Sequence, residues 1–162
     1  MEPTMKYPFN VRSFFTDRET KDIGSGIVLW RGYFQSVRPA IGRLLVNVDI
    51  STGTMYKPGP LLDLALDFLN KPGQYNILSP RRGMPDRERI RLQRFIAGVR
   101  ITTTHSGERV RKTPRVVKKL SDRGASDLSF TMRDGTSMTV AQYFQKFLNR
   151  PLRFPENICV EV

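Results

Sequence analysis

The chain contains 162 residues, has a mass of 18.6 kDa and carries a formal net charge of +12 at pH 7. A hydrophobic share of 39% provides for a buried core. The sequence has neither an apolar run of the ~20 residues that cross a bilayer nor the apolar core of a signal peptide, so we expect a soluble, intracellular protein that binds no membrane. One cysteine and one histidine exclude an internal disulfide and a multi-Cys or multi-His metal site, and we expect no cofactor.

The first third of the sequence predicts strands. Residues 1–26 form an extended, polar lead-in, and two strands follow at 27–37 and 43–51, separated at Arg38-Pro39. The second strand is followed by a break at Thr52-Gly53. One face of this strand is wholly apolar and is predicted to be buried: Leu44, Val46, Val48 and Ile50.

Two helices are predicted next. The first is short and apolar, covers residues 60–69 and has a proline in its first turn. The second begins at Pro85, and Asp86 and Glu88 lie in its first turn, where acidic side chains favour the helix dipole. Its buried stripe consists of Leu92, Phe95, Ile96 and Val99, and its outer side carries Arg87, Arg91 and Arg94.

The remainder alternates short strands with one helix. Strands are predicted at 99–104, 115–120, 128–133, 136–139 and 158–162, with a turn at Asp134-Gly135 joining two of them. Thr139 and Gln142 form a capping box at the start of a helix over 140–148. Its predicted buried stripe is Val140, Phe144, Phe147 and Leu148. This order of elements predicts an α+β fold with a small barrel-like sheet.

The excess charge is concentrated in residues 81–119, which hold thirteen basic and three acidic residues. Ten of the thirteen are arginine, whose planar fork suits phosphate. A field of this kind attracts polyanions, so we favour nucleic acid as the partner. A solvated face and a docking surface for an acidic protein are the alternatives.

Several motifs resemble a known family. The run WRGYFQSVRPAIGRLLVNVDIS at 30–51, with Met55-Tyr56, resembles the linker that precedes the PAZ domain in eukaryotic Argonaute proteins. The PAZ domain itself is resembled by a series of shorter motifs in the same order: GVRI at 98–101, Thr104-His105-x-Gly107, Arg111-Lys112, Arg115-Val116, Phe130, TVAQYF at 139–144, LRFP at 152–155 and Ile158-Cys159-Val160. The resemblance covers nearly the whole chain from about residue 22.

The resemblance implies a fragment of an Argonaute, with a lead-in and linker at 1–59 and a PAZ-like domain at 60–162. It implies a small OB-like β-barrel with a hairpin-plus-helix appendage, preceded by linker strands and a short helix. The implied function is binding of the single-stranded 3′ end of a small guide RNA in gene silencing, without base-specific readout. The implied partners are that RNA and other domains of the same Argonaute, in the cytoplasm or the nucleus.

The resemblance also assigns phosphate contacts. His105 matches a histidine that hydrogen-bonds a phosphate near the RNA terminus, and Arg111, Lys112 and Arg115 match a basic strand that contacts the phosphodiester. From the residues alone, a core histidine and a solvated strand face are the alternatives.

On the appendage, Phe130 matches the aromatic residue that packs against the terminal nucleotide, and Tyr143 matches a tyrosine that contacts a terminal phosphate. Without the resemblance, burial in the core is the favoured interpretation of Phe130. A lysine and a tyrosine of the family are replaced by Phe147 and Leu148, and Lys146 is the candidate to replace that lysine.

Two other departures from the family pattern lower the expected affinity or 3′-end selectivity. A further family tyrosine falls on Thr113-Pro114, and the strand that closes the family's cleft lies beyond Val162.

A catalytic role is not predicted. A nuclease needs clustered carboxylates or an acid–base pair, whereas the acidic residues here are scattered and the histidine has no histidine partner. Cys159, between Ile158 and Val160, is predicted to be buried and inert. The alternatives to 3′-end binding are an inter-domain scaffold and a generic basic surface for nucleic acid.

Overall fold

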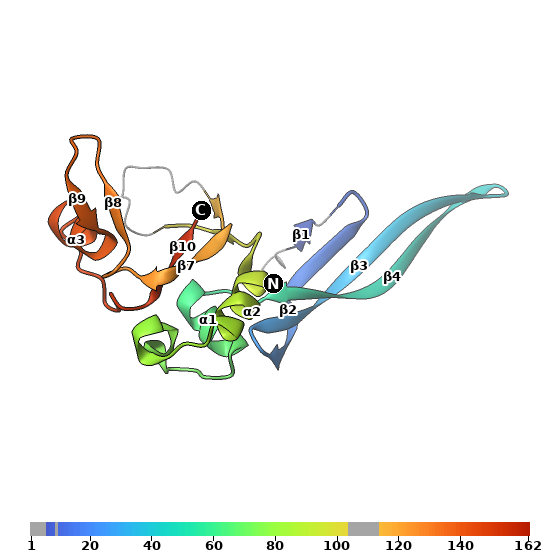
Figure 1. The fold of residues 1–162 in the computed structure, drawn as a ribbon. Helices are drawn as coiled ribbons and strands as arrows, with labels where there is room; N and C mark the ends of the chain where they lie inside the picture. Colours follow the sequence, from blue (N-terminus) through green and yellow to red (C-terminus); the bar gives the residue numbers. More distant parts are fainter. Residues whose placement is uncertain (1–5, 9, 104–113) are drawn as a thin grey trace. The chain divides into compact units, whose positions relative to one another are not determined.

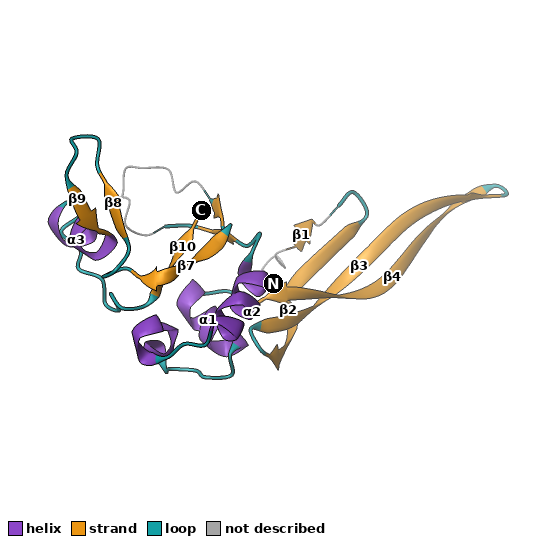
Figure 2. Ribbon diagram, in the orientation of Figure 1, coloured by secondary structure: helices purple, strands orange, loops and turns teal. Residues whose placement is uncertain are grey.

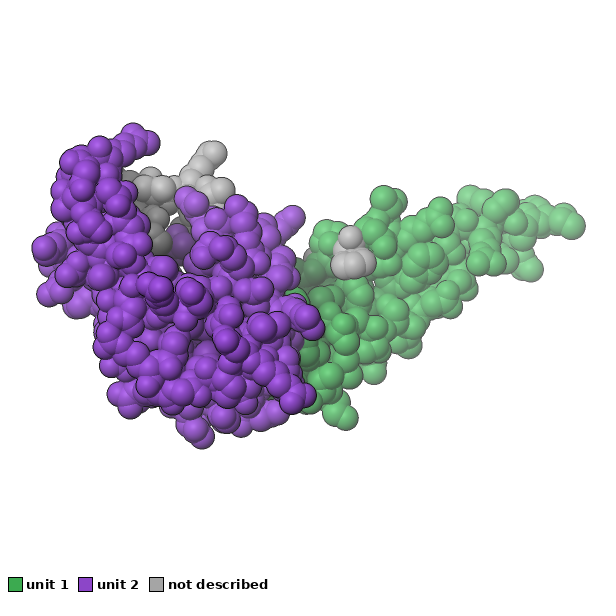
Figure 3. All heavy atoms as spheres, in the orientation of Figure 1, with its two compact units in different colours: residues 1–60 green, residues 61–162 purple. Residues whose placement is uncertain are grey.

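The computed structural model describes residues 6–8, 10–103 and 114–162. The chain divides into two units, Met1–Pro60 and Leu61–Val162, which Figure 3 shows in green and purple. The elements of each unit are labelled in Figure 1.

The first unit is an antiparallel sheet of four strands in the order β1-β2-β3-β4 (Figure 2). The strands are β1 (Lys6–Pro8), β2 (Ser13–Gly24), β3 (Ile27–Ala40) and β4 (Arg43–Tyr56). β3 and β4 pair without interruption from Ile27↔Tyr56 to Ala40↔Arg43. Gly42, at φ +69°, lies in the two-residue turn between them, in the left-handed conformation that glycine adopts without steric cost.

The strands are longer than the sequence predicts. β2 occupies part of the predicted lead-in, β3 continues through Pro39, and β4 continues through Thr52 and Gly53. The pairing of β2 with β3 ends at Ser13↔Phe34, so Pro39 lies where β3 pairs only with β4. Proline is tolerated in a strand at such an edge position.

The predicted burial of one β4 face is wrong. Leu44, Val46, Val48 and Ile50 are 72%, 68%, 58% and 70% exposed. Their cross-strand partners on β3 include Val37, which is also exposed. Alternation correctly places these side chains on one face, but nothing in the described part of the first unit covers that face.

The opposite face of the β3–β4 hairpin is covered at one point by Phe15 of β2. A Cβ atom built on Gly32 or on Gly53 would lie 2.6 Å from Cε1 of the Phe15 ring. No side chain fits there without displacing the ring, so glycine is required at both positions for this contact.

The second unit is built around a small apolar core. Its helical part contains α1 (Leu61–Phe68), the short 3-10 helices η1 (Tyr75–Leu78) and η2 (Pro80–Arg82), and α2 (Asp86–Ile96). The predicted start of α2 after Pro85 is confirmed, and Leu92 and Ile96 are buried as predicted. The core cluster consists of Ala65, Leu66, Leu78, Leu92, Ile96, Val117 and Leu120.

Residues 115–124 contain two short strands that pair with other strands of this unit. β5 (Arg100–Ile101) pairs with β6 (Arg115–Val116), and β7 (Lys119–Gly124) pairs with β10 (Ile158–Glu161). The two residues between β6 and β7 are also hydrogen-bonded to these partner segments. The N–H of Val117 donates to the Val99 carbonyl, and the N–H of Lys118 donates to the Glu161 carbonyl. These are short two-stranded pairings, and the expected closed OB-like barrel is not detected among the described residues.

The third pairing forms an appendage with a helix. β8 (Ser129–Thr131) and β9 (Ser137–Thr139) form the predicted hairpin, and α3 (Val140–Lys146) follows directly. In Figure 1 this appendage lies on the side of the second unit away from α2. The expected combination of hairpin and helix is therefore confirmed.

Candidate nucleic-acid interface

Three aromatic rings lie together on the appendage. The ring centroids of Phe130 on β8 and Tyr143 on α3 are 5.6 Å apart, with an interplanar angle of 71°. Phe147, one residue beyond α3, stacks on Tyr143 at 5.3 Å and 23°. We call Phe130, Tyr143 and Phe147 the aromatic cluster. Two of its rings are open to solvent, Phe130 at 38% and Phe147 at 55%.

The exposure of Phe147 contradicts its predicted place in the buried stripe. α3 is only seven residues long and has no fully buried residue, so its last turn leaves the core. The spacing of four between Tyr143 and Phe147 is the sequence signal that could have predicted their contact. The exposure of Phe130 likewise argues against core packing as its role.

Local hydrogen bonds fix the position of α3 and therefore of Tyr143. The predicted capping box is present: the N–H of Gln142 donates to Thr139 Oγ1 over 3.2 Å, and the N–H of Thr139 donates to Gln142 Oε1 over 3.0 Å. The N–H of Val140 donates to the Leu128 carbonyl, and that of Ala141 donates to the Ala125 carbonyl. The hairpin and the helix are thus tied together at the start of α3.

We expect Thr139→Ala to lower the free energy of unfolding by about 1 kcal/mol, because an N-cap hydroxyl is lost from a short helix. Denaturant unfolding followed by circular dichroism measures this change. Ser137→Ala, at an exposed position two residues earlier on the same strand β9, is the control and should cost less than about 0.5 kcal/mol. Equal losses in the two variants would contradict a stabilising role for the capping box.

Two of the predicted cations are exposed and described. Lys146 lies in the last turn of α3, three residues from Tyr143. Arg115 lies on β6, opposite Ile101 of β5. Three further predicted phosphate ligands, His105, Arg111 and Lys112, lie outside the described residues.

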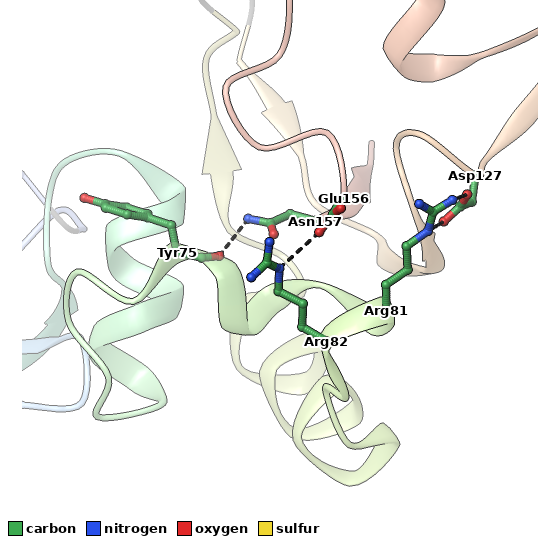
Figure 4. Close-up of polar contacts among 6 residues, drawn as sticks. All are labelled: Tyr75, Arg81, Arg82, Asp127, Glu156 and Asn157. Carbon is green, nitrogen blue, oxygen red and sulfur yellow. Dashed lines mark hydrogen bonds and ion pairs between the residues drawn. The ribbon is translucent and has the colours of Figure 1, made fainter.

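Part of the basic segment forms ion pairs within the unit (Figure 4). Arg81 binds Asp127 through two hydrogen bonds, one of them 2.8 Å from Nε to Oδ2, and this carboxylate raises the pKa of Arg81. Arg82 Nε donates to Glu156 Oε2 over 3.1 Å, and Asn157 Nδ2 donates to the Tyr75 carbonyl over 2.9 Å. These contacts tie η1 and η2 to the chain on either side of the appendage, so Arg81 and Arg82 have a structural role.

Cys159 is half-buried and lines an apolar cavity of about 390 Å³ with Phe144, Leu152 and Phe154 among its walls. Burial raises the pKa of the Cys159 thiol, which agrees with an unreactive side chain. In the described part of the chain, no group of three or more His, Cys, Asp or Glu residues could hold a metal ion. No helix among the described residues has the length and hydropathy needed to cross a membrane.

Family models match both units. The model for the Argonaute linker 1 domain matches residues 11–57, and the model for the PAZ domain matches residues 69–162. The chain therefore belongs to the Argonaute family, with a linker 1 domain followed by a PAZ domain. Neither of these domains is catalytic.

The chain is similar in sequence to Argonaute proteins of rice. The chain is 32% identical over 160 residues to Protein argonaute 14 and 33% identical over 162 residues to Protein argonaute MEL1, both of Oryza sativa subsp. japonica. Each match covers 98% of this chain and 15% of the rice protein.

A solved structure shares the fold. The chain is similar to Kluyveromyces polysporus Argonaute with a guide RNA, with a TM-score of 0.62 and 13% identity. That match covers 99% of this chain and 20% of the yeast protein.

Proposed function

We propose that the second unit binds the single-stranded 3′ end of a small guide RNA, as part of an Argonaute that acts in gene silencing in the cytoplasm or nucleus. The observation that carries the proposal is the solvent-open aromatic cluster on the appendage of a PAZ domain. The proposal includes an OB-like barrel facing the appendage, as the sequence resemblance implies.

The chemistry of the proposed site is phosphate contact combined with stacking. Phe130 offers a face for a terminal base or sugar, and stacking is sequence-tolerant because every base has a π-face. The Tyr143 hydroxyl and the Lys146 ammonium are proposed to contact phosphate, together with Arg115. His105, Arg111 and Lys112 keep the phosphate roles that the resemblance assigns to them.

The decisive experiment compares free and blocked RNA ends. A labelled duplex with two-nucleotide 3′ overhangs, a blunt duplex of the same sequence and a duplex with 3′-blocked overhangs are titrated with the protein. We expect the free overhang to bind at least tenfold more tightly than the other two, because only a free single-stranded end can enter a terminal site. Equal affinity for all three would refute 3′-end binding.

Phosphate contact predicts a defined salt dependence. The logarithm of the binding constant should fall with the logarithm of salt concentration by about 0.7 for each phosphate neutralised on a single strand. We expect Arg115→Ala to reduce that slope by about 0.7 and to weaken all sequences equally. Arg43→Ala, which removes an exposed arginine at the tip of the β3–β4 hairpin, is the control and should leave the slope unchanged. A loss that depends on base identity would contradict the assignment of Arg115.

One observation favours a second function, an inter-domain scaffold. The apolar face formed by Leu44, Val46, Val48 and Ile50 is exposed, as is typical of a surface that another domain covers. We propose that other domains of a longer Argonaute pack there. Absence of RNA binding even at low salt would leave the scaffold as the better description of the chain.

A further inference from the structure

We propose that α2 is a second RNA-binding surface, which contacts the phosphodiester backbone through an arginine stripe made of Arg87, Arg91 and Arg94. This inference goes beyond 3′-end binding, because it concerns the body of an RNA. The helix α2 itself lies away from the appendage within the second unit (Figure 1).

The three arginines form a continuous row. They lie at positions i, i+4 and i+7 of one helix, so their side chains share a face and span about 10 Å along the axis. All three are exposed, whereas Leu92 and Ile96 on the other side of α2 are buried in the core. The row is therefore presented by a helix that the core holds in place.

The acidic residues of α2 form ion pairs with basic residues outside the arginine stripe. Asp86 accepts a hydrogen bond from Arg89 Nε over 3.1 Å, and Glu88 lies 3.9 Å from the Lys71 ammonium. Within the described residues, the side chains of Arg87 and Arg94 form no ion pair or hydrogen bond. Arg89 is thus locally neutralised, while the stripe retains its charge.

The middle arginine is positioned by an aromatic pair. The Arg91 guanidinium lies 5.8 Å from the centroid of Phe68, and Phe68 stacks on Phe95 at 4.1 Å and 14°. A cation–π contact of this kind restricts the side chain while its N–H donors stay available. Less conformational entropy is then lost when the guanidinium binds an anion.

Phosphodiester is the anion that this chemistry fits best. The stripe consists only of arginines, whose planar forks bind phosphate through two parallel hydrogen bonds. A line of fixed cations matches the repeated phosphates of an RNA strand, whether paired or single. It requires no base contacts, as is usual when proteins bind the body of an RNA duplex.

The test uses RNA that cannot enter a terminal site. A blunt, 3′-blocked duplex and a 3′-blocked single strand are each titrated with the 162-residue protein between 0.05 and 0.5 M salt, a range of about tenfold in concentration. The variant Arg87→Gln/Arg91→Gln/Arg94→Gln removes the stripe. The control Arg12→Gln/Arg38→Gln/Arg43→Gln removes the same charge from exposed positions in the first unit.

We expect the stripe variant to lose at least tenfold in affinity at 0.1 M salt, and its salt slope to fall by about 2. The control should change affinity less than threefold. The RNA for which the stripe variant loses more affinity, duplex or single strand, is the form that the stripe contacts. The double variant Arg87→Gln/Arg94→Gln keeps the Arg91–Phe68 contact and should lose about two thirds of the slope change, so the test does not depend on the folding of the triple variant.

Equal losses in the stripe variant and the control would overturn the proposal, since net charge alone would then explain them. It would also be overturned by unchanged RNA binding with a loss of binding to a poly-glutamate peptide, because that pattern identifies an acidic protein as the partner. The 3′ ends of these RNAs are blocked, so a failure of this test is independent of the comparison between free and blocked 3′ ends.

Discussion

Replacing Leu66 with alanine should lower the free energy of unfolding of the second unit by about 3–5 kcal/mol, the upper part of the range for buried leucine. Leu66 has no exposed surface and lies in the core cluster among α1, α2 and β7. The loss combines the transfer free energy of the removed atoms with the cavity that they leave. In thermal unfolding, a domain of about 100 residues should melt about 12 °C lower or more.

Leu44→Ala is the matched control for this prediction. The substitution is chemically identical, but Leu44 is 72% exposed on β4. We expect a change below about 0.5 kcal/mol, as for other surface substitutions. A comparable loss at both positions would mean that the packing assigned to Leu66 or the exposure assigned to Leu44 is incorrect.

The second large effect concerns RNA affinity. We expect Phe130→Ala to weaken binding of a free 3′ end by about 1–3 kcal/mol, which is roughly 5- to 150-fold in the dissociation constant. Tyr143→Phe keeps the ring that contacts Phe130 and Phe147 but removes the hydroxyl, so it should cost less, about 0.5–1.5 kcal/mol. Titration of a labelled overhang at fixed salt measures both losses.

The control for these variants is Tyr33→Ala on β3. Tyr33 is 37% exposed, close to the 38% of Phe130, and it lies in the first unit. The Tyr33→Ala variant should bind RNA with the affinity of the unmodified chain. The melting temperature of the Tyr143→Phe variant should also be unchanged. Losses that persist with a 3′-blocked RNA would show that the aromatic cluster does not bind a terminus.

Sequence patterns predicted the features that depend on neighbouring residues. The capping box of Thr139 and Gln142, the hairpin at Asp134-Gly135 and the start of α2 after Pro85 are all present. Each depends on hydrogen bonds or dihedral preferences within a few residues, and these are encoded locally. The family resemblance, which depends on motifs in order along the chain, is confirmed as well.

The wrong or absent predictions concern features that depend on residues far apart in the sequence. Alternation on β4 defines an apolar face but does not encode whether another element covers it, so it predicts burial of Val46 and Val48, although no described element of the first unit covers them. Phe147 was predicted to be buried because the helical period was extended past the actual end of α3. The ion pairs of Arg81 and Arg82 join residues 46 and 74 positions apart, and no local pattern reveals them.

The close contact of the Phe15 ring with Gly32 and Gly53 favours one alignment of the strands of the first unit. In a long hairpin, a slip of two residues keeps every side chain on its own face, so hydrophobic patterning alone does not prevent it. Such a slip of β4 against β3 would bring Ser51 or Met55 to the place of Gly53 beneath the ring, and neither leaves the room that glycine leaves. The two glycines therefore favour a single strand register. The Phe15 ring fits in the observed alignment of the two fourteen-residue strands and would clash in the alignments shifted by two residues.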